Sequence, residues 1–266
     1  MTHVAIVTGA NHGIGAATAR QLAADGVAVL LTFLRQRVVE DSNTPEQYQQ
    51  NRMTDGEVVA AEIRASGGLC VAIEADLRQP EAATVLFDTA EREFGPVDIL
   101  INNATGWAVG DSFRTATSDV ADRTAAAVTA ELIDRTFGVD AKAAALLIAE
   151  FASRLEARDG KWGRIVGLTS GGPNGFPSEV TYGAAKAAQV SYTMSAATEL
   201  GRLGVTANIV YPPITDSGWV NQSVREFAAT DWEHFHVAQP GEVAGVIVWL
   251  CSDAARMVTG NIIRMR

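Results

Sequence analysis

The chain has 266 residues, of which 47% are hydrophobic, enough for one large domain with a sizeable core. Its formal net charge of −10 argues against nucleic acids and anionic membranes as its main partners. No window approaches the ~20 apolar residues that a membrane-spanning helix needs. The first residues follow a strand pattern and lack the basic region and cleavage site of a signal peptide, so we expect a cytoplasmic protein.

Short β-branched runs alternate with amphipathic helical patterns along the whole chain. This alternation predicts a single Rossmann-like α/β domain over residues 1–266, a doubly wound parallel sheet with helices on both faces. The predicted strands are residues 4–8, 27–33, 69–74, 99–102, 164–169, 206–211 and 261–264. The predicted helices are residues 14–24, 55–65, 80–94, 130–157, 182–202 and 240–251.

A glycine-rich turn, Thr8-Gly-Ala-Asn-His-Gly-Ile-Gly15, follows the first predicted strand and opens the first helix. Gly9, Gly13 and Gly15 allow a tight turn and close approach to a pyrophosphate, which the helix N-terminus stabilises. The sequence therefore predicts a dinucleotide site. The other turn residues that we expect to contact the cofactor are Asn11, His12 and Ile14.

The end of the second strand is expected to contact the adenosine ribose, where an acidic residue would favour NAD(H). The chain instead has Arg35 and Arg37, either of which can pair with a 2′-phosphate, with His12 nearby. Solvated loop charges are the alternative interpretation. We therefore prefer NADP(H), and NAD(H) stays open. Residues 36–53, polar and irregular, are expected to form a mobile surface insertion beside the adenosine end.

The next two strand ends also carry polar or small residues. Asp76, followed by Leu77, can accept from the adenine amine or can cap the following helix. Asn103 and Ala104 follow the fourth strand, where small and amide residues permit close approach to a cofactor. A simple turn is the alternative there.

No metal site is predicted, because the spacing of histidines and cysteines fits none. His234 and His236 would share one side of a strand, but we favour loop polarity as the explanation. Cys70 and Cys251 lie in apolar stretches, which favours buried thiols in a reducing compartment over a disulfide.

The stretch Tyr182-Gly-Ala-Ala-Lys186 places a phenol and an ammonium one helical turn apart. A neighbouring ammonium favours the phenolate, which tunes the phenol for proton transfer. Ser170 lies at the end of the fifth predicted strand and supplies a hydroxyl donor. The three groups suit the polarisation of a carbonyl oxygen and its protonation as hydride arrives.

In this order, the glycine-rich turn, Asp76, the Asn-Asn-Ala stretch, Ser170 and the Tyr182-x3-Lys186 pair resemble the short-chain dehydrogenase/reductase superfamily, over residues 4–264. The resemblance implies that Tyr182 is the general acid/base. It implies that Lys186 binds the nicotinamide ribose and lowers the Tyr182 pKa, and that Ser170 hydrogen-bonds the substrate oxygen.

Several positions depart from the family pattern. Asp140 stands where the family has a catalytic asparagine, and we expect it to keep the backbone role while adding a negative charge near Lys186. Thr105 replaces a glycine. Tyr182 follows Ser170 by 12 positions where 13 is usual, so Thr169 is the alternative to Ser170, which we favour.

The segment after the sixth strand, residues 212–237, is expected to form a loop and lid over the substrate. Pro212 begins it, and Thr215 or Ser217 resembles the family residue that contacts the nicotinamide carboxamide. Its aromatic residues can cover the substrate or pack against the core. Those residues are Trp219, Phe227, Trp232 and Phe235. Trp107 and Phe113 are candidates for the same pocket.

The resemblance implies NADP(H)-dependent interconversion of a carbonyl and a secondary alcohol on a small-molecule substrate. The segments around Ser170 and Thr215 are similar to those of 3-oxoacyl-thioester reductases. The family also implies a homo-oligomer, a tetramer or a dimer. A catalytically weak dinucleotide-binding regulatory protein on the same fold is the alternative.

Overall fold

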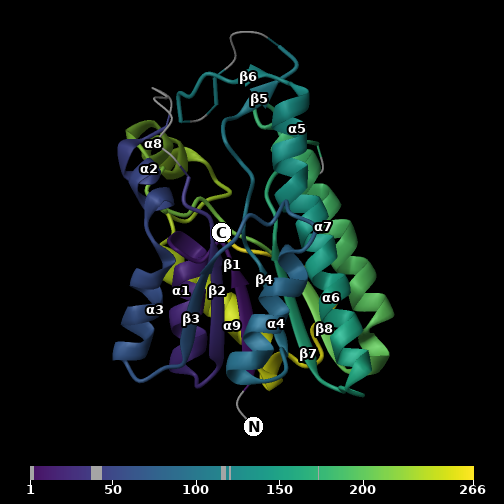
Figure 1. The fold of residues 1–266 in the computed structure, drawn as a ribbon. Coiled ribbons are helices and arrows are strands. Elements are labelled where there is room, and N and C mark those ends of the chain that lie inside the picture. The colour runs from purple at the N-terminus through teal and green to yellow at the C-terminus, as the bar shows by residue number, and fades with distance from the viewer. Residues whose placement is uncertain (1–2, 37–43, 115–117, 120, 173) are drawn as a thin grey trace.

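Seven parallel strands of mostly apolar residues form the centre of the molecule. The computed structural model describes residues 3–36, 44–114, 118–119, 121–172 and 174–266. The strand order is β3-β2-β1-β4-β7-β8-β9 (Figure 1). These strands are β1 (Val4–Thr8), β2 (Ala28–Phe33), β3 (Cys70–Glu74), β4 (Ile99–Asn102), β7 (Gly163–Leu168), β8 (Val205–Tyr211) and β9 (Ile262–Arg264). Every residue of β1, β2, β4 and β7 is buried, as expected for parallel strands covered on both faces.

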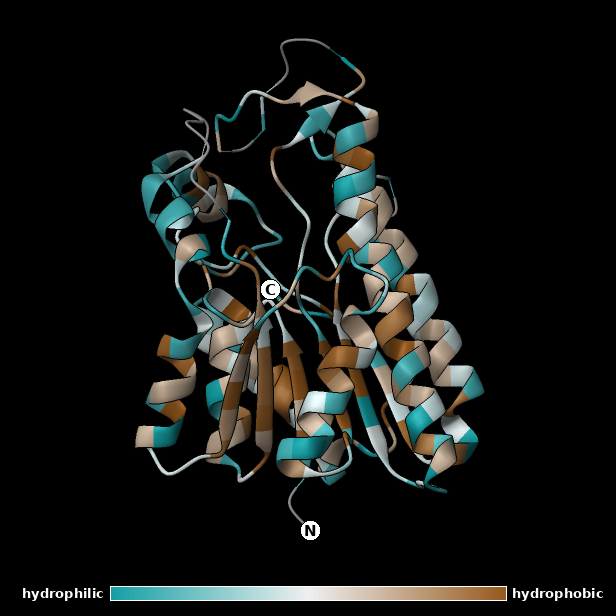
Figure 2. Cartoon of the chain, viewed as in Figure 1, coloured by the Kyte–Doolittle hydropathy of each residue, from teal (hydrophilic) through white to brown (hydrophobic). Residues whose placement is uncertain are grey.

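Helices cover both faces of the sheet. One face packs against α1 (Gly13–Ala24), α3 (Gly56–Ala65) and α9 (Pro240–Cys251). The other packs against α4 (Ala82–Phe94), α6 (Ala144–Ala157) and α7 (Val180–Glu199). Figure 2 shows mostly hydrophobic strands between helices that combine hydrophobic and hydrophilic residues. The predicted doubly wound α/β fold is confirmed.

The prediction of one regular α-helix over residues 130–157 is wrong in detail. This stretch consists of α5 (Ala130–Phe137), a π-helix η1 (Gly138–Ala143) and α6. A π-helix widens the turn and shifts which side chains point inward, and such insertions are frequent at functional sites. The helix predicted to end at residue 202 instead ends at Glu199, followed by a 3₁₀ turn, η2 (Gly201–Leu203).

Four features outside the seven-stranded sheet were not predicted from the sequence patterns. Part of the polar insertion forms α2 (Glu46–Met53), so residues 36–53 are not irregular throughout; residues 37–43 lie outside the described part. The segment after β8 contains α8 (Gln222–Thr230). Short strands β5 (Asp111–Ser112) and β6 (Ala126–Ala127) pair with each other. A 3₁₀ turn, η3 (Asp253–Ala255), follows α9.

The sheet order reverses between β1 and β4, so their connections leave toward opposite sides. In an open α/β sheet, ligands bind outside the carboxyl ends of the strands at such a point. The segments α2, α8, β5 and β6 extend beyond these carboxyl ends and surround the crevice (Figure 1). The topology therefore places the candidate site between β1 and β4.

Candidate active site

A cavity of about 1240 Å³ opens at the carboxyl ends of the strands. It gathers nearly all the residues that the sequence singled out. Those that line it are Gly9, Asn11, His12, Gly13, Ile14, Arg35, Asp76, Leu77, Asn103, Ala104, Ser170, Tyr182, Lys186, Pro212 and Thr215. Gly15 and Asp140 do not line the cavity. They contact residues that do: Gly15 packs against Gly9 and Asn103, and Asp140 pairs with Lys186. Arg37 lies outside the described residues.

The glycine-rich turn has the backbone that only glycine adopts easily. Gly9 and Gly13 have φ angles of +64° and +57°. A Cβ on Gly15 would lie 2.3 Å from the Gly9 carbonyl oxygen and 2.5 Å from Asn103 Nδ2. The backbone is thus bare toward the cavity at the N-terminus of α1, an arrangement that fits a dinucleotide pyrophosphate.

Thr8 ties this turn to the end of β4. Its Oγ1 accepts hydrogen bonds from the backbone N–H groups of Asn103 and Ala104, each at 3.0 Å, and donates to the Ile101 carbonyl. Asn103 Nδ2 in turn donates to the carbonyls of Thr8 and Gly9. The side chain of Asn103 therefore supports the turn, and the same residue lines the cavity.

At the end of β2, Arg35 is exposed and already paired. Its guanidinium lies 2.6 Å from Glu74 and 3.4 Å from Asp55. At the end of β3, Asp76 accepts from both Nε and Nη2 of Arg78, which lowers the Asp76 pKa to about 2. Asp76 does not cap the following helix.

His12 is neutral at physiological pH. Burial, together with the nearby Arg52 guanidinium, lowers its pKa to about 4. Its ring meets Tyr48 edge-on, with 5.8 Å between ring centres. His12 therefore offers no positive charge to a phosphate.

The inserted helix α2 forms one wall of the cavity. Asn11 of the glycine-rich turn donates to the Thr54 carbonyl at 2.9 Å, just after α2. Asn51 donates to the Ser217 carbonyl at 2.8 Å, and Arg52 donates to the Trp107 carbonyl at 2.9 Å. These contacts connect α2 to three separate loops around the crevice.

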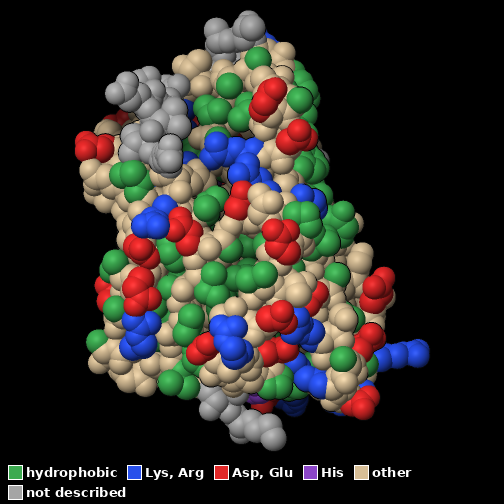
Figure 3. All heavy atoms as spheres, viewed as in Figure 1, with side chains coloured by type: hydrophobic (Ala, Val, Ile, Leu, Met, Phe, Trp, Pro, Cys, Tyr) green, Lys and Arg blue, Asp and Glu red, His purple; other side chains and the backbone are tan. Residues whose placement is uncertain are grey.

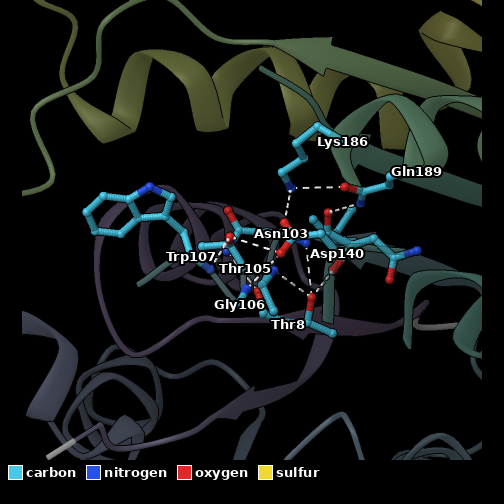
Figure 4. A network of polar contacts seen from close by, with 11 residues as sticks. Thr8, Asn103, Thr105, Gly106, Trp107, Asp140, Lys186 and Gln189 are labelled. Carbon is cyan, nitrogen blue, oxygen red and sulfur yellow. Dashed lines mark hydrogen bonds and ion pairs between the residues drawn. The ribbon is translucent and has the colours of Figure 1, made fainter. Parts of the chain in front are cut away.

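Lys186, which lines the cavity, forms a buried ion pair with Asp140, which does not (Figure 4). Lys186 Nζ lies 2.9 Å from Asp140 Oδ1 and donates to Gln189 Oε1, also at 2.9 Å. Gln189 Nε2 donates to the Asn102 carbonyl at 3.0 Å. Asp140 is thus brought beside Lys186, as the sequence led us to expect.

The other oxygen of Asp140 is held by the loop after β4. Asp140 Oδ2 accepts from Thr105 Oγ1 at 3.1 Å and from the Gly106 N–H at 2.8 Å. Thr105 Oγ1 also accepts from the Trp107 N–H at 3.0 Å. The π-helix turns Asp140 toward this loop, where it is completely buried. Asp140 therefore connects the loop to Lys186.

Tyr182 faces the cavity from the first turns of α7. Its pKa is raised well above its usual value by burial and by the negative charges of Asp140 and Glu179, while a hydrogen bond to Thr105 lowers it. Lys186 Nζ lies 5.7 Å from the centre of the Tyr182 ring. The lowered phenol pKa that the family resemblance implied is not found, because burial and, after it, the charge of Asp140 raise this pKa.

Ser170 and Thr169 both line the cavity directly after β7. Thr169 is buried and its backbone N–H donates to the Val210 carbonyl, which continues the pairing of β7 with β8. Ser170 is the more exposed of the two hydroxyls. Both stay candidates for contact with a substrate oxygen, and Ser170 is favoured.

Sequence reasoning missed a buried carboxylate near Tyr182. Glu179 accepts from Trp107 Nε1 at 2.6 Å and from Arg123 Nη2 at 3.0 Å. Burial raises its pKa to about 7, against the opposing effect of Arg123. The sequence signal that could have identified Glu179 is its position three residues before Tyr182, at the start of α7. Trp107 and Arg123 come from distant segments that only folding brings there.

The aromatic residues proposed for the pocket divide into two groups. Trp107, Trp219 and Phe227 line the cavity, as does Phe176, which the sequence did not single out. The other three point to solvent. They are Phe113, Trp232 and Phe235, with 84%, 76% and 75% exposure.

Within the described residues, no helix is both long and apolar enough to span a bilayer. The same residues contain no group of three or more metal-ligating side chains. The site is built from hydroxyl, amide, ammonium and carboxylate groups around a bare glycine-rich backbone.

Comparison with known proteins agrees with this geometry. The chain is 32% identical over 263 residues to the uncharacterized oxidoreductase YjdA of Bacillus subtilis, covering 98% of this chain and 94% of the relative. It is 31% identical over 261 residues to the 3-oxoacyl-[acyl-carrier-protein] reductase of Synechocystis, covering 97% and 93%. The solved structure of the angucycline C-6 ketoreductase LanV with bound NADP superposes with a TM-score of 0.77, at 28% identity and 98% and 93% coverage.

The family described as short chain dehydrogenase matches residues 3–228. This match spans the glycine-rich turn, the loop after β4 and the pair formed by Tyr182 and Lys186. The chain is therefore a member of the short-chain dehydrogenase/reductase family, and it is an NAD(P)-dependent oxidoreductase.

Proposed function

We propose that this protein is an NADPH-dependent reductase that converts a ketone into a secondary alcohol. The observation that carries the proposal is the cavity that combines the glycine-rich turn with Ser170, Tyr182 and Lys186. A bound nicotinamide supplies the hydride. Ser170 and Tyr182 hydrogen-bond the carbonyl oxygen, and Tyr182 gives its proton to that oxygen as the alcohol forms.

The protonation state of Tyr182 at neutral pH suits reduction. Reduction needs Tyr182 as a protonated acid, whereas oxidation needs it as a phenolate base. Burial and Asp140 raise its pKa, so the phenol keeps its proton. Lys186 Nζ, already hydrogen-bonded to Gln189, can return a proton toward Tyr182 after each turnover.

The shape and chemistry of the cavity support a bulky, ring-containing ketone. Trp107, Phe176, Trp219 and Phe227 line it beside Tyr182. Flat aromatic walls suit flat ligands, because offset or edge-to-face ring contacts add to the burial of apolar area. The similarity to a ketoreductase of an angucycline supports the same substrate class. The segment from Pro212 through α8 would be its lid.

A 3-oxoacyl thioester is the second candidate substrate, supported by the similarity to the Synechocystis reductase. The formal net charge of −10 disfavours an acidic carrier protein as the carrier of that thioester. We also propose a homo-oligomer in the cytoplasm, as the family resemblance implied. A regulatory dinucleotide-binding protein without turnover is the rival function.

The test is NADPH consumption against cyclic ketones, 3-oxoacyl thioesters and quinones, with the wild type, Tyr182→Phe and Tyr192→Phe. Tyr192 lies on the same helix, is 46% exposed and serves as the matched control. We expect Tyr182→Phe to lower turnover by about 10²–10⁴-fold while NADPH still binds. NADPH binding without Tyr182-dependent turnover on any substrate would favour the regulatory function.

A further inference from the structure

Five arginines line the cavity, and they differ in what neutralises them. Arg35 is paired with Glu74 and Asp55, Arg78 with Asp76, and Arg123 with Asp119 and Glu179. Arg52 and Arg135 have no carboxylate partner among the residues that the structure describes. Figure 3 shows Lys and Arg side chains gathered in the hollow between the upper segments.

Arg52 and Arg135 converge on one neutral acceptor. Both donate to Gln36 Oε1, Arg135 at 2.7 Å. Arg52 also donates to the Trp107 carbonyl and Arg135 to the Gly106 carbonyl. Burial and the neighbouring positive charges of Arg52 and Arg78 lower the Arg135 pKa. Two guanidiniums that share a single amide oxygen repel each other, and an anion between them would relieve this repulsion.

The position of Arg52 matches the adenosine ribose. Its carbonyl accepts from the Gln36 N–H at 3.3 Å, three residues after the end of β2. The same carbonyl lies 3.5 Å from Asn11 Nδ2 of the glycine-rich turn. The backbone of Arg52 therefore stands between the turn and the end of β2, where this class of fold distinguishes a ribose hydroxyl from a ribose phosphate, and its guanidinium reaches the side chain of Gln36 there.

Its guanidinium is also held in place by aromatic rings. It lies 5.5 Å from the centre of the Tyr48 ring and 5.9 Å from that of the Trp107 ring. Such stacking reduces the side-chain freedom that is lost when a phosphate binds.

We propose that Arg52 and Arg135, rather than Arg35, bind the 2′-phosphate of NADPH. This inference rests on the proposed NADPH-dependent function and assigns a role to the inserted helix α2. A phosphate monoester carries about −1.5 to −2 charges near neutral pH, which two guanidiniums match. The charge of Arg35 is already balanced by Glu74 and Asp55. A phosphate bound to Arg35 would also lie close to these two carboxylates, which would repel it.

The test is equilibrium binding of NADPH and of NADH, measured by cofactor fluorescence and calorimetry. The variants are Arg52→Gln, Arg135→Gln and the matched control Arg35→Gln. We expect Arg52→Gln and Arg135→Gln each to raise the Kd for NADPH by about 10-fold or more, as for loss of a charge-assisted hydrogen bond. The Kd for NADH should change less than about 3-fold, because NADH lacks the 2′-phosphate. Unchanged NADH binding also shows that each variant is folded.

Three outcomes contradict the proposal, and one separates it from the proposed function. A selective loss of NADPH affinity in Arg35→Gln but not in Arg52→Gln would return the phosphate to Arg35. Equal losses for NADH and NADPH in Arg52→Gln would place its contact on the shared part of the cofactor. Unchanged binding of both cofactors but an altered KM for an anionic substrate would assign the arginines to that substrate. A wild type that binds neither cofactor overturns the proposed function itself.

Discussion

Thr105 Oγ1 donates a 3.1 Å hydrogen bond to Asp140 Oδ2, so two positions that depart separately from the family pattern contact each other. The threonine replaces a glycine and the aspartate replaces an asparagine. The aspartate faces Lys186 with its other oxygen, 2.9 Å away. The two substitutions therefore act as one unit, in which the loop after β4 holds a carboxylate against the lysine.

Removing the charge of Asp140 is expected to shift the pH dependence of the reaction. Asp140 raises the pKa of Tyr182, so Asp140→Asn lowers that pKa. Reduction is lost as the pH rises through the Tyr182 pKa, and its alkaline limb should move to lower pH in the variant. The measurement is kcat/KM for reduction across pH.

The matched control is Asp134→Asn, the same charge change at an exposed position of α5. It should leave the alkaline limb in place. An identical limb in the wild type and in Asp140→Asn would remove Asp140 from the proton relay.

The buried Glu179 should make stability fall with rising pH. Its pKa is about 7 in the folded protein against 4.5 in the unfolded chain. The folded state therefore binds more protons between these values, and stability decreases from pH ~4.5 to ~7 by up to on the order of 3 kcal/mol. Glu179→Gln should lose less stability than the wild type between pH 5 and 8 in urea unfolding.

Glu199→Gln is the control for this effect, because Glu199 is an exposed residue at the other end of α7. Glu199→Gln should change the free energy of unfolding by the same small amount at about pH 5 and at about pH 8. A pH dependence in Glu179→Gln that matches the wild type would show that Glu179 does not titrate in this range.

The Thr8 hydroxyl is expected to be important for both stability and cofactor binding. Thr8→Val leaves the Asn103 and Ala104 N–H groups without their acceptor, which costs about 1–3 kcal/mol of unfolding free energy. It also frees the glycine-rich turn, so NADPH should bind more weakly. Thr8→Ser, which keeps the hydroxyl, should retain most of both properties; equal losses in the two variants would point to packing instead.

Gly15 should not tolerate even one methyl group. A Cβ there meets the Gly9 carbonyl at 2.3 Å, so Gly15→Ala must displace the turn, and we expect a loss of about 1–3 kcal/mol together with weaker NADPH binding. The control is Gly241→Ala in the first turn of α9, where the nearest atom would be 3.7 Å away. That substitution should be neutral or slightly stabilising in thermal unfolding. Similar behaviour of the two variants would contradict the steric argument.

The sequence by itself determined the sheet, the glycine-rich turn and the position of the Tyr182–Lys186 pair. These features depend on local patterns: continuous apolar runs for buried parallel strands, glycines at positive φ, and a four-residue spacing on one helix face. The expectation that Asp140 lies near Lys186 also followed from chain position relative to the family motifs.

Only the tertiary structure decided which charges remain unpaired. Arg35 and Arg52 look equally available in the sequence, yet Arg35 meets Glu74 from a neighbouring strand while Arg52 meets only neutral oxygens among the described residues. The raised pKa of Tyr182 and the presence of Glu179 beside Trp107 depend likewise on segments far apart in the chain. Burial and charge pairing are properties of the packed molecule, because both depend on neighbours that the local sequence does not specify.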